Sequence, residues 1–467
     1  MIKVKGGYLD PITCHMGLLQ GGVLSPILFN LYIDDIRYIF DEVCDPINLL
    51  NEQISHLLYA DDLIIFSKTE NGLKQSLRNI EEYCKLWQLD INVKKSKIMI
   101  FNRSGKKLKS DQYMLQGRPL EVTDSYCYLG IDFTPSGSFR HTQRNLREKA
   151  QKAMFPLYSV ISQFNISISH SLNLFQTFVN PIALYNSENW ATLSEHKIES
   201  INNKKSILTS YLLDSEPDKI LKKFLKFLLG VNKSTSTLAI LGETGNFPLF
   251  LHGFLSLLKF WHRISNIDTS SLVSKALQEQ MNGATQSEWL RTVHFLLKYL
   301  GMERSIQHVK EINYNQFQDD CKKKLREKFI NEWKDLSKSN TKLETYEQIK
   351  EKFEREPYLE NVTDFQSRKS IAKFRCSDHK LEIEIGRHNK IPRESRVCRM
   401  CPNCIEDEMH FLCKCPNYNT IHAHYFGLAT LTNEAGKSIL KCKEKEVSLK
   451  LANYLQKAYL IRETLAF

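Results

Sequence analysis

The chain has 467 residues, 42% of them hydrophobic and 25% charged, which excludes a disordered polymer and suggests about two to four folded domains. The sequence contains neither an apolar run of the ~20 residues that span a membrane nor a recognisable signal peptide, so we expect an intracellular, non-secreted protein of the nucleus or cytoplasm. The net charge of +11 favours a nucleic acid partner, although it also suits a protein that is merely soluble.

The first part of the chain, residues 1–139, alternates short apolar segments with amphipathic ones, as α+β proteins do. The segment "SPILFNLYIDDIRYIF" (residues 25–40) predicts a helix, because a proline stands in its first turn and apolar residues follow at helical spacing. Those apolar residues are Leu28, Leu31, Tyr32, Ile36 and Ile39. A second amphipathic helix is predicted through Leu73, Leu77, Ile80, Cys84 and Trp87.

Three segments of this part predict strands. "SHLLYADDLIIFS" (residues 55–67) predicts two strands joined by a tight turn, and "KIMIF" (residues 97–101) predicts a strand before the basic loop "NRSGKKLKS". "YCYLGIDFTPSGSF" (residues 126–139) predicts another hairpin, with its turn at Pro135, Ser136 and Gly137. Long helices are expected from about residue 140 to residue 345, and loop-rich chain from about residue 361.

Two adjacent acids, Asp61 and Asp62, interrupt the apolar run of residues 55–67. On a straight strand they would point to opposite faces, but at a tight turn both can approach one cavity. Two such carboxylates suit a bound Mg²⁺ ion, which proteins hold through one or two carboxylates together with substrate phosphates. The alternative is an ordinary aspartate-rich turn, which these three letters "ADD" favour when they are taken alone.

The neighbouring motifs decide between these two interpretations. "GLLQGGVLSPILFNLYIDDI" (residues 17–36) precedes the two acids, and "LDINVKKSKIMIF" (residues 89–101) and "YLG" (residues 128–130) follow them. In this order and spacing the motifs closely resemble the reverse transcriptases of non-LTR (LINE-type) retrotransposons. The family signature G-x-x-Q-G-x-x-L-S-P-x-x-F-N is met at Gly17, Gln20, Gly21, Leu24, Ser25, Pro26, Phe29 and Asn30. A looser resemblance continues through residues 181–190 and 229–264.

The resemblance implies RNA-directed DNA synthesis, in which Asp61 and Asp62 hold two Mg²⁺ ions for nucleotidyl transfer to a primer 3′-hydroxyl. The implied partners are an RNA template, a DNA primer and deoxynucleoside triphosphates, with no membrane. Contacts to these partners are implied for Gln20, Gly21, Asn30, Lys95, Tyr128, Leu129 and Gly130. Among them, Lys95 would approach the triphosphate and the residues 128–130 would grip the primer end. The alternative for each is an ordinary loop or surface residue.

One part of the family's catalytic site is not found in the sequence. The polymerase palm of this family uses a further aspartate on a strand before the Gln-Gly loop, and "YLDPITCHM" (residues 8–16) resembles the strand that leads directly into that loop. We therefore expect the first catalytic strand and the fingers to be absent. Asp34 and Asp35 match ordinary family positions, and Asp10 is a weaker substitute. With an incomplete cation site, the chain is expected to be inactive alone.

Two other functions remain open at this point. The chain could be a fragment that binds RNA or template–primer without synthesis, or a relic transposon product with no role. Binding of nucleic acid with a salt-dependent affinity would separate these two.

A cysteine cluster follows near the carboxyl end, in "RVCRMCPNCIEDEMHFLCKCPNY" (residues 396–418). Closely spaced thiolates and imidazole suit a tetrahedral Zn²⁺ ion, and the alternative is a reduced cluster without metal. The segment resembles the cysteine–histidine element of LINE-type proteins, which implies the ligands Cys398, Cys401, His410 and Cys415. Cys404 and Cys413 are alternative ligands, since Cys401 and Cys404 also have C-x-x-C spacing.

The predicted fold is therefore α+β, with a partial polymerase palm of antiparallel sheet and packed helices. Five segments are expected: a partial palm at residues 1–139, a thumb-like helical region at 140–210, a helical extension at 211–360, a zinc-finger-like Cys/His element at 361–433, and a C-terminal helical tail at 434–467.

Overall fold

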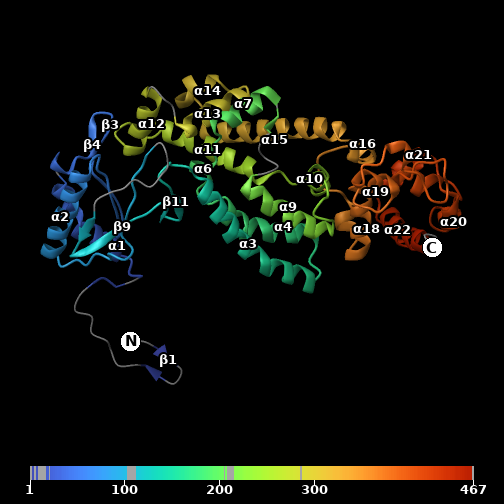
Figure 1. Cartoon of the computed structure of the whole chain (residues 1–467), viewed down its shortest axis with the longest axis horizontal. Helices are drawn as coiled ribbons and strands as arrows, with labels where there is room; N and C mark the ends of the chain where they lie inside the picture. Colours follow the sequence, from blue (N-terminus) through green and yellow to red (C-terminus); the bar gives the residue numbers. More distant parts are fainter. Residues whose placement is uncertain are drawn as a thin grey trace. The chain divides into compact units, whose positions relative to one another are not determined.

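The computed structural model describes all residues except 1–2, 5–6, 9–16, 20, 41, 103–111, 205, 208–214, 284–286 and 465–467. The chain divides into two compact units: Met1–Ser138 with Thr269–Asn282, and Phe139–Asp268 with Gly283–Phe467 (Figure 1). The finer division into five segments stays a prediction. Within the described part, every helix is too short or too polar to cross a lipid bilayer.

The first unit combines short strands with a few helices, so the predicted α+β class is confirmed. Its strands are β1 (Lys3–Val4), β2 (Gly7–Tyr8), β3 (Ile47–Leu49), β4 (Glu52–Ile54), β5 (His56–Tyr59), β6 (Asp62–Ile65), β7 (Lys97–Ile98), β8 (Tyr113–Leu115), β9 (Arg118–Val122), β10 (Tyr126–Tyr128) and β11 (Ile131–Phe133). Its helices are α1 (Ser25–Tyr32), η1 (Asp34–Ile39), η2 (Glu42–Cys44), α2 (Glu70–Leu86) and α12 (Leu272–Asn282). All strand pairs are antiparallel except β7 with β9.

Helix α2 supplies the core of the first unit. It begins after Thr69, whose hydroxyl accepts a hydrogen bond from the amide of Gly72 at 3.2 Å. Its apolar stripe is buried against strands β8 and β9. The buried members of this core are Ile36, Leu77, Ile80, Tyr83, Cys84, Ile98, Tyr113, Leu115 and Leu120. The helix predicted for residues 73–87 is therefore confirmed. The strand predicted at residues 97–101 is shorter than expected, because only Lys97 and Ile98 pair with β9.

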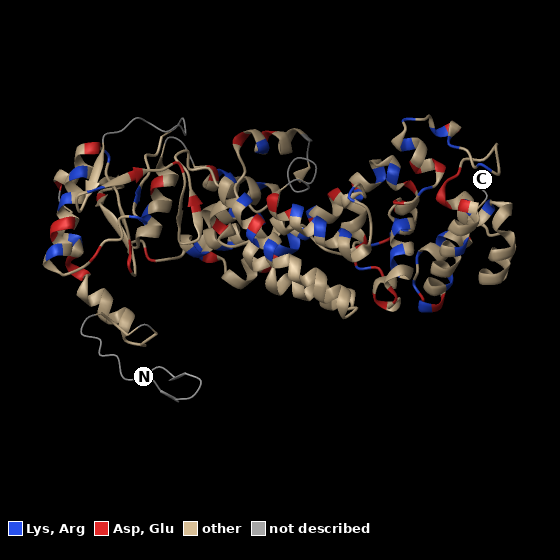
Figure 2. Cartoon of the chain, turned by 60° about the horizontal axis from the view of Figure 1, so that its bottom comes forward, with Lys and Arg blue, Asp and Glu red and all other residues tan. Residues whose placement is uncertain are grey.

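The helix predicted for residues 25–40 forms only in its first half, α1, and continues as the 3₁₀ helix η1. The expected buried stripe is wrong for α1, since Leu28, Leu31 and Tyr32 are exposed, while Ile36 in η1 is buried. α1 also has no charged residue, whereas Lys, Arg, Asp and Glu occur on many other helices of the chain (Figure 2). The first unit thus presents an uncharged apolar helix surface.

The hairpin predicted at residues 126–139 forms, but its predicted turn is wrong. Strands β10 and β11 pair with Tyr128 opposite Ile131, so the turn consists of Leu129 and Gly130 rather than Pro135–Gly137. Both turn residues have positive φ, 48° and 80°, as a type I′ hairpin turn requires. The proline-containing segment forms a separate turn after the hairpin, in which the Gly137 amide donates to the Thr134 carbonyl.

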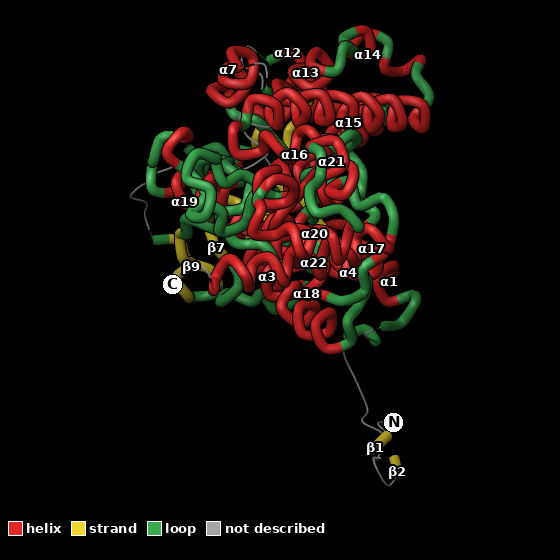
Figure 3. The backbone as a smooth tube through the Cα atoms, turned by 90° about the vertical axis from the view of Figure 1, so that its right-hand side faces the viewer, coloured by secondary structure: helices red, strands yellow, loops and turns green. Residues whose placement is uncertain are grey.

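The second unit is helical, as expected from residue 140 onward (Figure 3). Its helices are α3 (Arg140–Gln163), α4 (Ile168–Phe178), α5 (Asn180–Ala183), α6 (Ser187–Trp190), α7 (Glu195–Lys204), α9 (Glu216–Leu229), α10 (Thr237–Thr244), α11 (Leu249–Ser265), α13 (Glu288–Tyr299), α14 (Arg304–Gln307), η4 (Val309–Glu311), α15 (Tyr314–Ser339), η5 (Thr341–Leu343), α16 (Glu344–Ile349), α17 (Tyr358–Asn361), α18 (Phe365–Arg375), α19 (Glu382–His388), η6 (Arg393–Ser395), η7 (His410–Lys414), η8 (Pro416–Tyr418), α20 (Asn419–Phe426), α21 (Asn433–Leu440) and α22 (Lys445–Thr464). The part after residue 361 contains more helix than its loop-rich sequence predicted.

A buried ion network links distant segments of the second unit. The Arg375 guanidinium donates two hydrogen bonds to the Glu243 carboxylate, at 3.0 and 2.8 Å, and both side chains are fully buried. It also contacts Glu356 at 2.9 Å and the carbonyl of Leu440. Tyr358 donates to Glu243 at 2.7 Å. Burial would raise the pKa of Glu243, but Arg375 lowers it below its ordinary value. The network therefore joins α10, α17, α18 and α21.

Replacing Arg375 with methionine should lower the free energy of unfolding of the second unit by roughly 3–5 kcal/mol, because the buried carboxylate of Glu243 loses its counter-charge, while Glu356 keeps its ion pair with Lys350. Urea denaturation measures this change. Arg393→Met is the matched control, since Arg393 pairs with Glu344 at 2.5 Å on the surface, where both side chains are more than a third exposed. That control should change stability by less than about 1 kcal/mol. Equal effects of the two substitutions would contradict this account of the network.

Asp218, fully buried in α9, holds the beginning of α11. Its carboxylate accepts hydrogen bonds from the amides of Leu249 and Phe250, at 2.6 and 3.4 Å, and from the Ser215 hydroxyl at 2.6 Å. Burial raises the pKa of Asp218 to about 6, although these hydrogen bonds oppose the shift. Between about pH 4 and pH 6, Asp218 therefore keeps its proton in the folded protein. In the unfolded chain, where the carboxyl has its ordinary pKa of 3.8, the proton has already been released.

This difference makes stability depend on pH. Because the folded pKa is the higher one, Asp218 lowers the free energy of unfolding as pH rises from about 4 to about 6. Asp218→Asn should remove this contribution, so that stability declines less, or rises more, than in the parent across that window. Denaturation at several pH values measures both slopes, and identical slopes would contradict the assignment.

Candidate functional site

The two acids lie at the turn of an antiparallel hairpin, as predicted. Strands β5 and β6 pair with Tyr59 opposite Asp62, which leaves Ala60 and Asp61 as a two-residue turn. Both carboxylates are exposed. Ala60 has a φ of 52°, a left-handed conformation that favours glycine and is costly for a residue with a Cβ atom. Such strained residues cluster at functional sites, because the surrounding structure must hold them in place.

The second hairpin, β10–β11, lies close to the first. The pKa of the Tyr128 hydroxyl is raised above its ordinary value by burial, by the negative charge of Asp62 and by the neighbouring Tyr59. Tyr128 is therefore near enough to the turn that carries the acids for the charge of Asp62 to act on its hydroxyl. The residues Leu129 and Gly130 form the turn that directly follows Tyr128.

The predicted triphosphate-binding residue lies on a turn attached to the second hairpin. The amide of Lys95 donates to the side-chain oxygen of Asn92 at 3.2 Å, and the Tyr126 hydroxyl of β10 donates to the Lys95 carbonyl at 3.2 Å. The Lys95 side chain is exposed. Its neighbour Lys97 forms an ion pair with Glu121 at 2.6 Å. The turn is therefore anchored on both sides, while the Lys95 ammonium stays available.

The remaining predicted polymerase residues lie on the segment that leads into α1. Gly21 is exposed and has a φ of 83°, which only glycine adopts at little cost, and Asn30 is exposed on α1. Gln20 and Asp10 lie outside the described residues. Asp34 pairs with Arg37 at 3.0 Å, and Asp35 accepts a hydrogen bond from Tyr83 at 2.5 Å. These two carboxylates are thus engaged by other side chains.

Two exposed carboxylates on a rigid turn fit a hard divalent cation such as Mg²⁺, which prefers oxygen ligands and keeps several waters. Among the described residues, no third carboxylate, histidine or cysteine gathers with them into a potential metal site. Asp61 and Asp62 therefore supply part of a cation site, to which substrate phosphates and further ligands would have to contribute.

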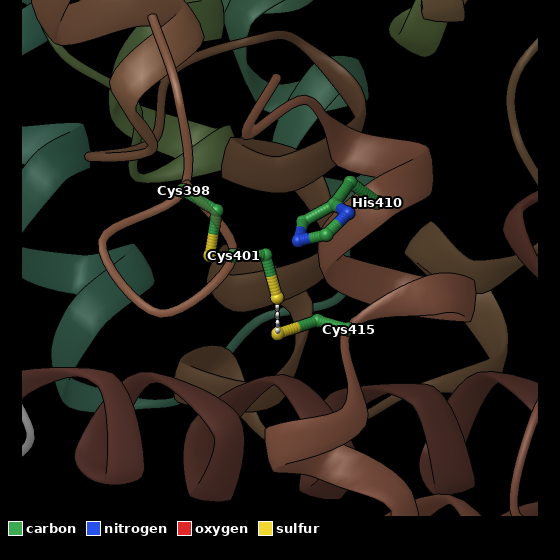
Figure 4. Close-up of side chains that lie close together, drawn as sticks. All are labelled: Cys398, Cys401, His410 and Cys415. Atoms are coloured by element: carbon green, nitrogen blue, oxygen red, sulfur yellow. Dashed lines mark hydrogen bonds between the residues drawn. The ribbon is translucent and has the colours of Figure 1, made fainter. Parts of the chain in front are cut away.

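The predicted zinc ligands converge in the second unit. The ligand atoms of Cys398, Cys401, His410 and Cys415 all lie within 4.8 Å of one another (Figure 4). Cys401 Sγ and Cys415 Sγ are 3.9 Å apart, close to the about 3.8 Å expected for two thiolates at ~2.3 Å from one tetrahedral zinc ion. The donor set therefore has the size and the chemistry that Zn²⁺ requires.

Local backbone structure explains how the four donors meet. The first two cysteines lie in a knuckle, where the Cys398 amide donates to the Cys404 carbonyl at 2.8 Å and the Cys401 amide to the Cys398 carbonyl at 3.2 Å. The other two donors flank a π-helical turn, closed by the hydrogen bond from the Cys415 amide to the His410 carbonyl at 2.9 Å. This wider turn brings the spacing H-x-x-x-x-C onto one side of the chain.

The electrostatics of the cluster also suit a metal. His410 Nε2 is buried and has no hydrogen-bond partner among the described residues, which leaves a ligand lone pair or proton unsatisfied. Burial raises the pKa of the Cys401 thiol to about 12. Burial acts in the same direction on Cys415, but the His410 imidazole and hydrogen bonds from Asn417 lower the pKa of this thiol to about 7. Cys415 is therefore the thiol most ready to bind as a thiolate.

The two alternative ligands lie elsewhere. Cys404 is exposed at the end of the knuckle. Cys413 is buried against α21, so close that a Cβ atom on Gly436 would lie 2.2 Å from its sulfur. Among the described residues, the cluster that could hold a metal contains neither thiol. The binding of zinc itself remains a prediction.

Comparison with known proteins identifies the first region. Residues 1–133 match the family described as reverse transcriptase (RNA-dependent DNA polymerase). The Pol polyprotein of the type-1 retrotransposable element R2 from Nasonia vitripennis is 30% identical over 146 residues, which cover 29% of this chain and 14% of that protein. This region is therefore similar to the reverse transcriptases of non-LTR retrotransposons. A second relative, the probable RNA-directed DNA polymerase from transposon BS of Drosophila melanogaster, is 22% identical over 216 residues, or 44% of this chain and 23% of that protein.

The chain therefore spans less than a quarter of the length of either relative. The reverse transcriptase match ends close to the end of the second hairpin, and it includes every predicted polymerase residue. The cysteine–histidine cluster lies outside the matched residues.

Sequence reasoning missed several residues that support these sites. Tyr59 was not singled out, although it lies near Tyr128 and helps to raise the pKa of that hydroxyl. The only indication of Tyr59 in the sequence was its position before the acids in "YADD". Asn417, whose amide contacts Cys415 Sγ at 3.4 Å, stands in the "CPNY" part of the cysteine element. The strain at Ala60 could not be predicted from the sequence, because alanine rarely adopts a positive φ and the residue type does not signal this conformation.

Purified protein should contain about one equivalent of zinc, and Cys415→Ser should lose it, because the substitution removes a thiolate from a four-ligand site. Elemental analysis measures the metal, and a chelator should lower the melting temperature of the parent but not of this variant. The matched control is Cys404→Ser, which should keep the zinc. Zinc lost equally from both variants, or below about a tenth of an equivalent in the parent, would reject this ligand set.

Proposed function

We propose that this chain contributes the metal-binding hairpin of a non-LTR reverse transcriptase active site and acts in RNA-directed DNA synthesis as part of a larger polymerase. The observation that carries the proposal is the tight turn with the exposed Asp61 and Asp62, whose charge acts on Tyr128, inside the region that matches the reverse transcriptase family. The substrates would be an RNA template, a DNA primer and deoxynucleoside triphosphates.

Each residue has a role that follows from its position. Asp61 and Asp62 would hold Mg²⁺, which activates the primer 3′-hydroxyl and offsets charge on the phosphates. The exposed Lys95 ammonium would bind the triphosphate as a positive charge. Tyr128, Leu129 and Gly130, on the tight turn beside the acids, would orient the primer end. A structural zinc ion at Cys398, Cys401, His410 and Cys415 would stabilise the second unit.

Two features favour a requirement for further polymerase residues. The candidate substitutes for a third carboxylate, Asp34 and Asp35, are bonded to Arg37 and Tyr83. The segment before and within α1 exposes large apolar side chains, with Val23, Leu19 and Leu31 at 91%, 80% and 70% exposure. A continuous exposed apolar surface of this kind marks a contact with another polypeptide segment. The 467-residue polypeptide alone would then bind nucleic acid without copying it.

A primer-extension assay with Mg²⁺ tests this proposal, together with a binding assay on the same RNA–DNA template–primer. We expect the chain to bind with an affinity that falls steeply with salt, because Lys and Arg displace counterions from the phosphates. We expect no more extended primer than with the double variant Asp61→Asn, Asp62→Asn, which removes the cation ligands.

The two readouts separate the alternatives. Extension by the parent chain that disappears in Asp61→Asn would show a complete active site and would contradict the requirement for further residues. Binding that is weak and independent of salt would contradict any role in handling nucleic acid and would favour a relic product. Binding without extension supports the proposal.

A further inference from the structure

The second unit contains a cavity of about 290 Å³ that none of the predicted sites uses. It lies where the end of α3, the start of α4, the end of α9 and the start of α18 meet. Its walls are mainly apolar and include Ile161, Ile168, Phe227, Leu228 and Phe365. The volume is near the lower end of the ~300–1,000 Å³ range of small-ligand pockets, so it suits a planar group of one or two rings.

A cationic side chain forms part of the wall of this apolar cavity. Arg368 is 7% exposed, and its Nη1 donates to the carbonyls of Val362 and Thr363, at 2.9 and 2.6 Å. These two bonds fix the plane of the guanidinium. Its Nε is buried and has no hydrogen-bond partner among the described residues. An apolar cavity built only for packing has no need of a buried charge with an unused donor, because such a donor is costly.

The rim of the cavity combines aromatic rings with ammonium groups. Lys369 lies over the ring of Phe365, 6.0 Å from its centroid, and the ring of Phe227 contacts Tyr158 at 4.2 Å between centroids. One turn earlier on α9, Lys223 lies over the ring of Phe155 at 5.2 Å. Asn165, exposed at the α3–α4 turn, adds an amide.

Acidic groups near the opening are already bonded. Asp364, next to Phe365, accepts a hydrogen bond from the Ser367 amide at 2.7 Å and so caps α18. Asp378 accepts from the amide and the side chain of Asn232, both at 2.8 Å. The ammonium groups next to this wall that can meet a ligand's charge are those of Lys223, which is exposed, and of Lys369, which is half-buried.

We propose that this cavity holds one unpaired base of single-stranded RNA, with the flanking phosphates near Lys223 and Lys369. The inference rests on one part of the proposed function, namely that the chain binds RNA. Aromatic faces and an arginine plane stack on any base, and a guanidinium or amide donor at the wall pairs with base oxygens and nitrogens. An apolar ligand without acceptors would leave Arg368 Nε without a partner, and a duplex could not place a base inside the cavity.

The experiment measures binding of the full chain to a twelve-nucleotide oligo(U) that carries one 2-aminopurine. We expect Phe365→Ala to weaken binding roughly tenfold and to abolish the quenching of 2-aminopurine, because a stacking face is lost. Phe178→Ala is the matched control, since Phe178 is 56% exposed and does not line the cavity. It should change affinity less than about twofold, with both variants folded by circular dichroism.

Three outcomes would overturn the inference. They are equal affinities of Phe365→Ala and the parent, tighter binding of an RNA duplex than of the single strand, and a Phe365-dependent preference for oligo(dT) over oligo(U). The last outcome would assign the cavity to single-stranded DNA. Failure of the proposed function would give a different result, because the parent chain would then bind no nucleic acid. If only this inference fails, the parent chain still binds RNA, and Phe365→Ala leaves the affinity unchanged.

Discussion

The buried guanidinium of Arg375 is the interaction on which the second unit depends most. It lies in a fully buried position between Glu243 and Glu356, and it reaches the carbonyl of Leu440 at the end of α21. Separating Arg375 from these carboxylates would leave uncompensated charge in a medium of low polarity. The four segments that meet at Arg375 are therefore held in one arrangement. α21 continues this chain of contacts, because Gly436 lies against Cys413 in the π-helical turn that positions His410 and Cys415. The metal cluster is thus supported by the same core.

The candidate site of the first unit depends instead on the geometry of two tight turns. Its sheets are small, and its candidate site consists of the ends of two short hairpins rather than of a broad surface. The left-handed conformation at Ala60 fixes the direction of the turn with the acids, and the glycine at position 130 allows the tight turn beside Tyr128. Burial, and after it the charge of Asp62, raises the pKa of the Tyr128 hydroxyl.

Local sequence patterns predicted the local structures well. The hairpin of residues 55–67 and helix α2 follow from alternation and helical spacing, which neighbouring residues encode. The four residues of the cysteine–histidine cluster were implied by the family resemblance, since spacing alone left Cys404 and Cys413 as alternatives. Non-local contacts could not be predicted. Arg375 and Glu243 are separated by 132 positions, and the sequence around either residue does not indicate its partner. The turn at Leu129 and Gly130 was misplaced because Pro135 and Gly137 give a stronger turn signal. The exposure of α1 was missed because an apolar stripe predicts burial without naming what covers it.

The central claim is that Asp61 and Asp62 hold the metal of a polymerase site beside the turn of residues 128–130, and iron-mediated cleavage tests it directly. Fe²⁺ in place of Mg²⁺, with ascorbate and peroxide, generates radicals that cut the backbone beside the bound ion. The account predicts cuts at residues 59–62 and at residues 128–130 together, suppressed by excess Mg²⁺ and lost when Asp61 and Asp62 are replaced by asparagine. Cuts confined to other parts of the chain, or cuts at these hairpins that persist without the two carboxylates, would contradict it.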